Sequence, residues 1–193
     1  MRKLLAIAAA ALAVQACAHR TTIITGPGAA NRHDVDAVLK ANPVGPEEAV
    51  KAARLGADER GSFHLVQIRT REKPHFHASH DLVVNLVRGK GDLFMLEESA
   101  TAYLFSLVPM RPGDSAWIGR GTTHFFVNGG PAPAIAFATY VPPFDGKDVV
   151  PFLVKEVDEV GGWMQKEGFT VKRLDVFFTG SGTGSVRFEG TKR

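Results

Sequence analysis

The chain has 193 residues, enough for one domain with short appendages, and 45% of them are hydrophobic, which allows a sizeable core. Twenty glycines, eleven prolines and thirteen phenylalanines favour a turn-rich β protein over a helical bundle. Basic residues exceed acidic ones by 23 to 20, and by only 21 to 20 without Arg2 and Lys3, and the chain has no basic strip interleaved with aromatics. We therefore expect no nucleic-acid partner.

The first sixteen residues are typical of an export signal. A charged start is followed by Leu4–Val14, an apolar run of eleven residues, whereas a membrane span needs about 20. Val14-Gln15-Ala16-Cys17 then resembles a bacterial lipobox, although its second residue departs from the usual pattern. Cys17 is the only cysteine, so it cannot form an internal disulfide, and lipid attachment explains its presence. We predict a signal peptide over 1–16 and a lipoprotein exported to the periplasm, anchored to the outer or inner membrane; a plain signal peptide cut nearby is the alternative.

The segment up to residue 60 is predicted to be an appendage of the domain. Residues 17–45 have little periodicity and are interpreted as a lipidated N-terminus and tether, with a short helical turn at Asp34–Lys40 and a surface histidine at His33. Pro46 followed by two acids is a good helix start, so a short helix is expected over 46–60, packed on the outside of the domain.

The residue pattern of 61–145 is typical of a β domain. Short alternating runs recur every 8–12 residues or so, separated by glycine-rich turns, which indicates an all-β sandwich or barrel. The predicted strands are Phe63–Thr70, Leu82–Arg88, Asp92–Leu96, Ala102–Val108, Ser115–Ile118, His124–Val127 and Ala134–Val141.

Residues 146–193 are predicted to be a C-terminal extension that completes or flanks the barrel. Val157–Lys166 is expected to be a short helix, and Thr170–Phe178 with Ser185–Glu189 to be a hairpin around a glycine-rich turn.

Four histidines carry the main functional signal. His75, His77 and His80 lie within six residues, and the first two share one face of an extended strand. His124 follows a second glycine-punctuated segment. Neutral imidazoles suit Fe, Mn, Ni, Cu and Zn ions, and an all-nitrogen set favours Zn, Cu or Ni over Mn. We predict a divalent metal site at these histidines, and a structural role for His64.

These segments resemble the two motifs of the cupin superfamily of small β-barrels. The first motif corresponds to His75-x-His77 with Gly89 closing the strand. The second corresponds to Gly113, five residues, Gly119-Arg120-Gly121, two residues, His124, three residues and Asn128, with only the usual proline replaced, by Gly119. The resemblance covers about residues 60–145. It implies a single cupin jelly-roll β-barrel with a metal held at its histidines, and a homodimer formed through edge strands.

One departure from the resemblance concerns the glutamate ligand of the first motif, whose place is taken by Leu82. His80 has the same strand parity as position 82 and is the preferred replacement, which gives a ligand set of His75, His77, His80 and His124. Asp81 is a second option that needs a bulge, and a bare set of three histidines is a third. A barrel in which Leu82 has abolished metal binding is the remaining alternative.

The same parity predicts an apolar cavity around the metal. Val84, Leu86 and Phe126 are expected to line it, with Asn128 forming a turn. Arg69, Trp117 and Tyr140 are either polar contacts of the cavity or packing and surface residues.

Three functions follow from these observations. The preferred one is an exported lipoprotein that binds a divalent metal and a small-molecule ligand. The resemblance also implies a metal-dependent dioxygenase or isomerase acting on a small organic molecule. The third is a structural domain of the cell envelope with no site. The fold alone does not decide among them.

Overall fold

The computed structural model describes residues 21–26, 31–98, 103–152, 169–178 and 184–192, together with Glu159, Gly162 and Lys166. The predicted signal peptide over 1–16 and Cys17 lie outside these residues. In the described part of the chain, no helix is both long and apolar enough to cross a membrane.

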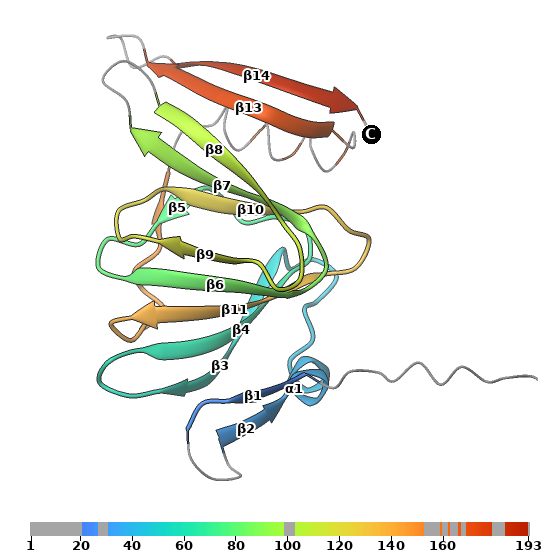
Figure 1. Ribbon diagram of the computed structural model, residues 1–193, viewed down its shortest axis with the longest axis vertical. Helices are drawn as coiled ribbons and strands as arrows, with labels where there is room; N and C mark the ends of the chain where they lie inside the picture. The colour runs from blue at the N-terminus through green and yellow to red at the C-terminus, as the bar shows by residue number, and fades with distance from the viewer. Residues whose placement is uncertain are drawn as a thin grey trace, which may run out of the picture.

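Two antiparallel sheets enclose one interior (Figure 1). The larger contains, in spatial order, β12 (Val150–Pro151), β5 (His75–Phe76), β10 (His124–Asn128), β7 (Gly91–Glu98), β8 (Tyr103–Met110), β13 (Phe169–Phe178) and β14 (Gly184–Lys192). The smaller contains β3 (Val50–Ala57), β4 (Ser62–Ile68), β11 (Ala134–Val141), β6 (Asp81–Arg88) and β9 (Ser115–Ile118). This is a jelly-roll barrel of the double-stranded β-helix type, so the predicted all-β fold class is confirmed.

Alternation along the strands builds the barrel interior. Leu82 and Ile118 are cross-strand partners that both face inward, and Trp117 and Val83 form the next pair, on the outer face. The interior cluster consists mainly of aliphatic side chains: Val66, Ile68, Leu82, Leu86, Leu93, Met110, Ile118, Phe126, Ala134, Ala136 and Ala138. All seven strands predicted between residues 63 and 141 are present, because their period-2 pattern matches two sheets packed face to face.

Two glycines of the predicted motifs occupy turns that require them. Gly89 connects β6 to β7 with φ of +86°, and a Cβ there would lie 2.9 Å from Cα of Ala134. Gly113 connects β8 to β9 with φ of +99°. Residues other than glycine rarely adopt this left-handed backbone conformation.

The helix predicted over 46–60 is wrong, because this segment contains strand β3. Glu48 accepts a hydrogen bond from the backbone N of Gly45 (2.6 Å), as at a helix start, but the contact closes only a turn. The chain then pairs with β4 from Val50 to Ala57, with a shift of register between Arg54 and Gly56. Backbone bonds to β4, and the packing of half-buried Val50 against the interior cluster, outweigh the helical preference of an alanine-rich segment.

The tether predicted over 17–45 is also wrong for the residues described. Thr22–Ile24 (β1) pairs with Arg32–Asp34 (β2), and α1 (Val35–Ala41) follows. The helical turn expected at residues 34–40 is confirmed, with the Asp34 carboxylate capping its first turn. Buried Val35 packs with Leu65 and Ile135 on the outer face of the smaller sheet. The outer helix is therefore α1 rather than residues 46–60 (Figure 1).

The C-terminal hairpin is confirmed. β13 and β14 pair with each other, and β13 also pairs with β8, so the extension continues the larger sheet (Figure 1). In the predicted helix over 157–166, Glu159, Gly162 and Lys166 are helical, and its other residues lie outside those described.

Candidate metal centre

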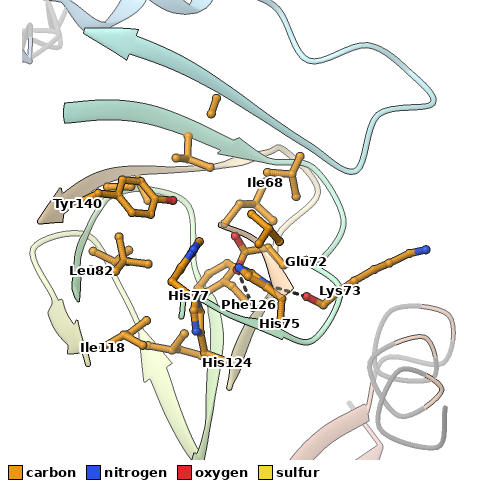
Figure 2. A pocket seen from close by; sticks show the side chains of 18 of the residues that line it. Ile68, Glu72, Lys73, His75, His77, Leu82, Ile118, His124, Phe126 and Tyr140 are labelled. Atoms are coloured by element: carbon orange, nitrogen blue, oxygen red, sulfur yellow. Dashed lines mark hydrogen bonds between the residues drawn. The ribbon is translucent and has the colours of Figure 1, made fainter. Parts of the chain in front are cut away.

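Three histidines meet at one end of the barrel interior (Figure 2). His75 lies in β5 and is the direct cross-strand partner of His124, the first residue of β10. His77 follows β5 with its ring on the same side, as the two-residue spacing predicts. The ring centroids are 4.5 Å apart for His75 and His124, 5.2 Å for His75 and His77, and 5.5 Å for His77 and His124. One potential ligand atom from each ring lies within 4.8 Å of the other two.

All three rings are oriented in the same way by backbone carbonyls. Nδ1 of His75 donates to Lys73 O (2.8 Å), Nδ1 of His77 to Asp148 O (2.6 Å) and Nδ1 of His124 to Thr122 O (2.9 Å). A carbonyl only accepts, so the neutral form of each ring carries its proton on Nδ1. Each Nε2 is then left with a free lone pair, which is the usual state of a metal-ligating histidine.

Two of the rings are deeply buried and favour the neutral state. His77 and His124 are 3% and 2% exposed. Burial lowers the pKa of His77, and burial together with the nearby His75 and His77 rings lowers the pKa of His124 to about 3. Nε2 of His77 is the only fully buried side-chain nitrogen or oxygen among the described residues that lacks a hydrogen-bond partner. An orphaned lone pair beside two similar nitrogens fits a divalent metal ion and is otherwise costly.

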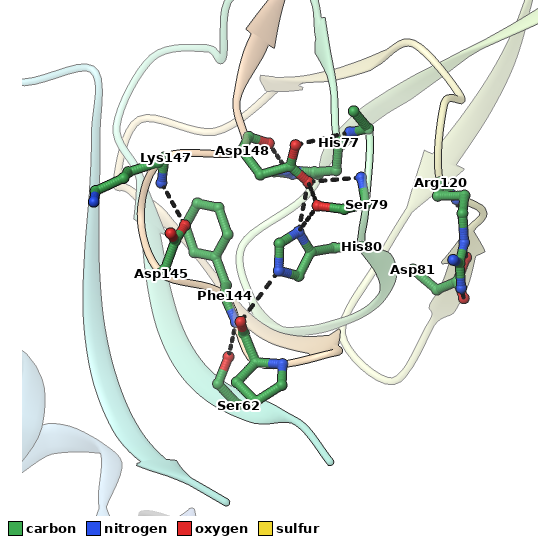
Figure 3. Close-up of polar contacts among 12 residues, drawn as sticks. Ser62, His77, Ser79, His80, Asp81, Arg120, Phe144, Asp145, Lys147 and Asp148 are labelled. Carbon is green, nitrogen blue, oxygen red and sulfur yellow. Dashed lines mark hydrogen bonds and ion pairs between the residues drawn. The ribbon is translucent and has the colours of Figure 1, made fainter. Parts of the chain in front are cut away.

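His80 does not join this group, contrary to the prediction. Its Nδ1 contacts the Asp148 carboxylate (2.5 Å) and its Nε2 contacts the carbonyl O of Pro143 (3.1 Å), so both nitrogens face acceptors (Figure 3). A ring engaged at both nitrogens has no lone pair left for a metal. The parity argument fails because the chain between β5 and β6 leaves the extended conformation after His77.

Asp81, the second option, points away from the site. Its carboxylate pairs with Arg120 (2.8 Å), whose side chain holds the pKa of Asp81 below its ordinary value (Figure 3). The structure therefore supports the third alternative, because it brings together His75, His77 and His124 without a carboxylate.

Asp148 is a site residue that the sequence does not reveal. Besides the carbonyl that holds His77, its carboxylate accepts hydrogen bonds from Ala78 N (3.1 Å), Ser79 N (2.9 Å) and Ser79 Oγ (2.9 Å) (Figure 3). Burial opposes its ionisation, but these bonds and the one to His80 outweigh that effect and keep its pKa below the ordinary range. Seventy-one residues separate it from His77, so no local pattern links the two.

Replacing Asp148 with alanine is expected to weaken metal binding by roughly 10–100-fold, as loss of an outer-shell partner typically does. The carboxylate fixes the segment whose carbonyl orients His77, so its loss loosens one ligand. The measurement is a competition titration of zinc. Asp81→Ala, which removes a carboxylate at the start of β6 that pairs with Arg120 away from the site, serves as the control. Equal zinc affinities in the two variants would contradict this role.

A largely apolar cavity of about 360 Å³ adjoins the histidines. Val84, Leu86 and Phe126 line it, as predicted, and so does Tyr140. Leu82, 4% exposed, faces the same cavity, which places the position of the missing glutamate beside the site (Figure 2).

A carboxylate at position 82 is expected to complete the metal centre. Leu82→Glu should raise zinc affinity by about tenfold or more, a factor that requires only about 1.4 kcal/mol from the added ligand. The metal-free variant should be less stable than the parent, because it buries an unpaired acid. Val83→Glu, on the opposite face of the strand, is the control. Unchanged zinc affinity for Leu82→Glu would mean that position 82 does not reach the metal.

Glu72 also lines this cavity and was not predicted. It lies in the loop before β5, where an isolated bridge between Arg71 and Val127 brings the chain against β10. Burial raises the pKa of Glu72, and burial with the nearby Glu72 charge raises that of Tyr140. The only sequence signal was an acid three residues before His75, in a stretch without strand periodicity.

Other residues lie outside the centre. Arg69 donates to Gly45 O, and Trp117 is 71% exposed on the outer face. Asn128 shapes the turn after β10 by bonding Ala132 O and Gly130 N, as predicted. His64 bonds Ser62 Oγ (3.0 Å) and has the structural role expected, and His33 contacts Thr25 Oγ1.

Fold and site together define a jelly-roll, double-stranded β-helix barrel with a three-histidine centre that can hold a metal. No protein-family model matches the chain. An uncharacterized protein of Aquifex aeolicus (strain VF5) is 32% identical over 117 residues, which are 61% of this chain and 88% of that protein. The chain belongs to the family of this Aquifex protein.

Solved structures with a similar fold are more distant in sequence. BH2720 from Bacillus halodurans matches with a TM-score of 0.48 and 16% identity, over 67% of this chain and 92% of that one. A Klebsiella pneumoniae protein with a double-stranded β-helix domain matches at 0.45 and 13%, over 59% and 95%. The nucleoside dehydratase Pac13 matches at 0.45 and 16%, over 61% and 92%.

Proposed function

We propose that the protein binds one divalent transition-metal ion through Nε2 of His75, His77 and His124, and that the metal binds a small organic molecule in the adjoining cavity. The convergence of three Nε2 lone pairs, each set by a backbone carbonyl at Nδ1, carries this proposal. A barrel with a purely structural role has no need for an orphaned buried nitrogen at that point.

The donor set indicates which ions fit. Three neutral imidazoles without a carboxylate favour Zn, Cu or Ni over Mn, while Fe also accepts imidazole ligands. Three protein ligands leave positions open for water or for a ligand, as in catalytic rather than structural zinc sites.

The cavity indicates what kind of molecule binds. Its volume of about 360 Å³ is at the lower end of the usual range for small-molecule sites. Its walls are mainly aliphatic and aromatic, so they favour an apolar body over a phosphorylated or highly charged metabolite.

Metal analysis tests the proposal. Purified protein is stripped with a chelator, reloaded separately with Zn, Ni, Cu, Fe(II) and Mn, and its metal content is measured. We expect close to one ion per chain for the preferred metal, and none in the His75→Ala/His124→Ala variant with an unchanged β-rich circular dichroism spectrum. The absence of stoichiometric metal under every loading condition would refute metal binding and favour a structural role.

A catalytic form of the proposal, a metal-dependent dioxygenase or isomerase, is favoured by one observation. Glu72 and Tyr140 bring two oxygen groups into the cavity that the three histidines also line. Oxygen consumption by the metal-loaded protein with a panel of thiols and phenols tests the dioxygenase. Turnover that disappears with the metal would support it, whereas ligand binding without turnover would leave a binding protein.

The proposal includes export and a lipid anchor at Cys17. Its support is the sequence of the first seventeen residues, with a charged start, a short apolar run and a lone cysteine. Cell fractionation tests it: a Cys17→Ser variant should leave the membrane fraction. An unchanged distribution between membrane and soluble fractions would contradict the anchor.

A further inference from the structure

Glu72 is the only acidic side chain among the described residues that line the cavity. Two backbone-linked bonds hold it against β10: its N donates to Phe126 O (2.9 Å), and its Oε2 accepts from Phe126 N (3.0 Å). Phe126 is two residues from His124, so the carboxylate is fixed to the strand that supplies a metal ligand. Figure 2 shows Glu72 beside His75 on the cavity wall.

The second carboxylate oxygen, Oε1, has no hydrogen-bond partner among the residues that the structure describes. The lining residues Ile68 and Phe126 are apolar, and the His75 ring beside Glu72 donates its Nδ1 proton to Lys73 O instead. Lys73, the neighbouring cation, is exposed and extends away from the histidines (Figure 2). A carboxylate oxygen in such a wall is stabilised by a donor that enters the cavity, either water or a group of a ligand.

We propose that Glu72 is the second anchoring point of the ligand, after the metal. The ligand is then a small, mainly apolar molecule with one metal-binding atom and one hydroxyl or N–H donor. The inference rests on the proposed metal site. Glu72 accepts the donor through Oε1, while the metal takes the other polar atom and the aliphatic wall takes the body of the molecule.

The charges at the site agree with this class. Three neutral imidazoles leave the full charge of a divalent ion uncompensated. A bound ion would therefore favour the ionised form of Glu72 close by, against the effect of burial on its pKa. A ligand bearing a further anionic group at the Glu72 end would meet like charge in a cavity of low polarity, so phosphates and dicarboxylates are excluded.

The test compares two probes on zinc-loaded protein by calorimetry. The ring nitrogen of 3-hydroxypyridine and of 3-methoxypyridine can bind the metal, but only the first carries a hydroxyl donor. We expect the wild-type protein to bind 3-hydroxypyridine more tightly by about tenfold or more, since a site built to accept a donor strongly rejects an analogue without one.

The Glu72→Gln variant should lose or invert this preference. Its amide oxygen can still accept from Phe126 N, so the amide NH₂ then faces the cavity in place of Oε1. Zinc content should stay unchanged, because Glu72 is not a ligand. Glu47→Gln, at an exposed acid outside the cavity, is the matched control and should keep the wild-type preference.

The outcomes separate the two proposals. Failure of the wild-type protein to hold zinc would refute the metal site itself. If zinc binds normally, an unchanged ratio of the two affinities in Glu72→Gln would overturn the role of Glu72. Failure of both probes to bind zinc-loaded protein would overturn it equally.

Discussion

Replacing His124 with alanine is expected to lower zinc affinity by more than the roughly 10–100-fold that the loss of an outer-shell partner costs. His124 supplies one of three Nε2 donors and is 2% exposed, so neither another side chain nor bulk water can readily take its place. Because the ring lies directly across from His75 in the β5–β10 pair, its removal also leaves that ring without its neighbour. Competition titration with a chromophoric chelator measures the affinity.

Two other histidines serve as matched controls for this prediction. His33 lies in β2, away from the barrel interior, and His33→Ala should leave zinc affinity unchanged. His80→Ala should cost much less than His124→Ala, since His80 is bonded to Asp148 and meets the His77 ring only edge-on, with 6.3 Å between the ring centroids. A loss in His80→Ala as large as that in His124→Ala would restore His80 as a ligand.

The metal-free protein is expected to lose stability as the pH falls from 7.5 to 5. The folded pKa of His124 is lowered to about 3. In the unfolded chain its pKa is near 6.5, so below that value the unfolded state binds more protons, and acidification favours unfolding. For this residue alone the loss between pH 7.5 and pH 5 is about 2 kcal/mol. Burial also lowers the pKa of His77 and of His64, which adds to the loss in the same direction.

Urea unfolding in the presence of a chelator measures this effect. Asp148 does not contribute in this window, because its carboxylate stays ionised in both states until the pH falls below its ordinary value. In His124→Leu the dependence on pH should be weaker by about 2 kcal/mol, since the residue that takes up the proton on unfolding is gone. The same dependence in parent and variant would show that His124 is not held neutral by the fold.

The sequence predicts the barrel well because its strands obey a local rule. Side chains alternate between the interior and the outer face along the described strands between residues 62 and 141, and the turns contain glycines such as Gly89 that the backbone requires. The prediction fails over 46–60, where an acid-capped, alanine-rich segment has a local preference for helix. Its pairing with β4 is a long-range interaction that no local pattern reveals.

The metal centre is predicted in part for the same reason. His75 and His77 share a face by spacing, and the glycine-rich second segment brings His124 to the same end of the barrel. His80 lies beyond the end of β5, where strand parity no longer holds. Asp148 and Glu72 reach the site through tertiary contacts. The backbone carbonyl of Asp148 bonds His77, and Glu72 lies in an irregular loop bonded to β10.

Anomalous diffraction at the zinc edge, from crystals of the zinc-loaded protein, tests the metal centre most directly. We expect one peak per chain, about 2.0–2.1 Å from Nε2 of each of His75, His77 and His124, with Nδ1 of each ring still bonded to its backbone carbonyl. A peak bound through Nδ1, a peak at His80 and Asp148 instead, or no peak in loaded crystals would contradict the proposed site.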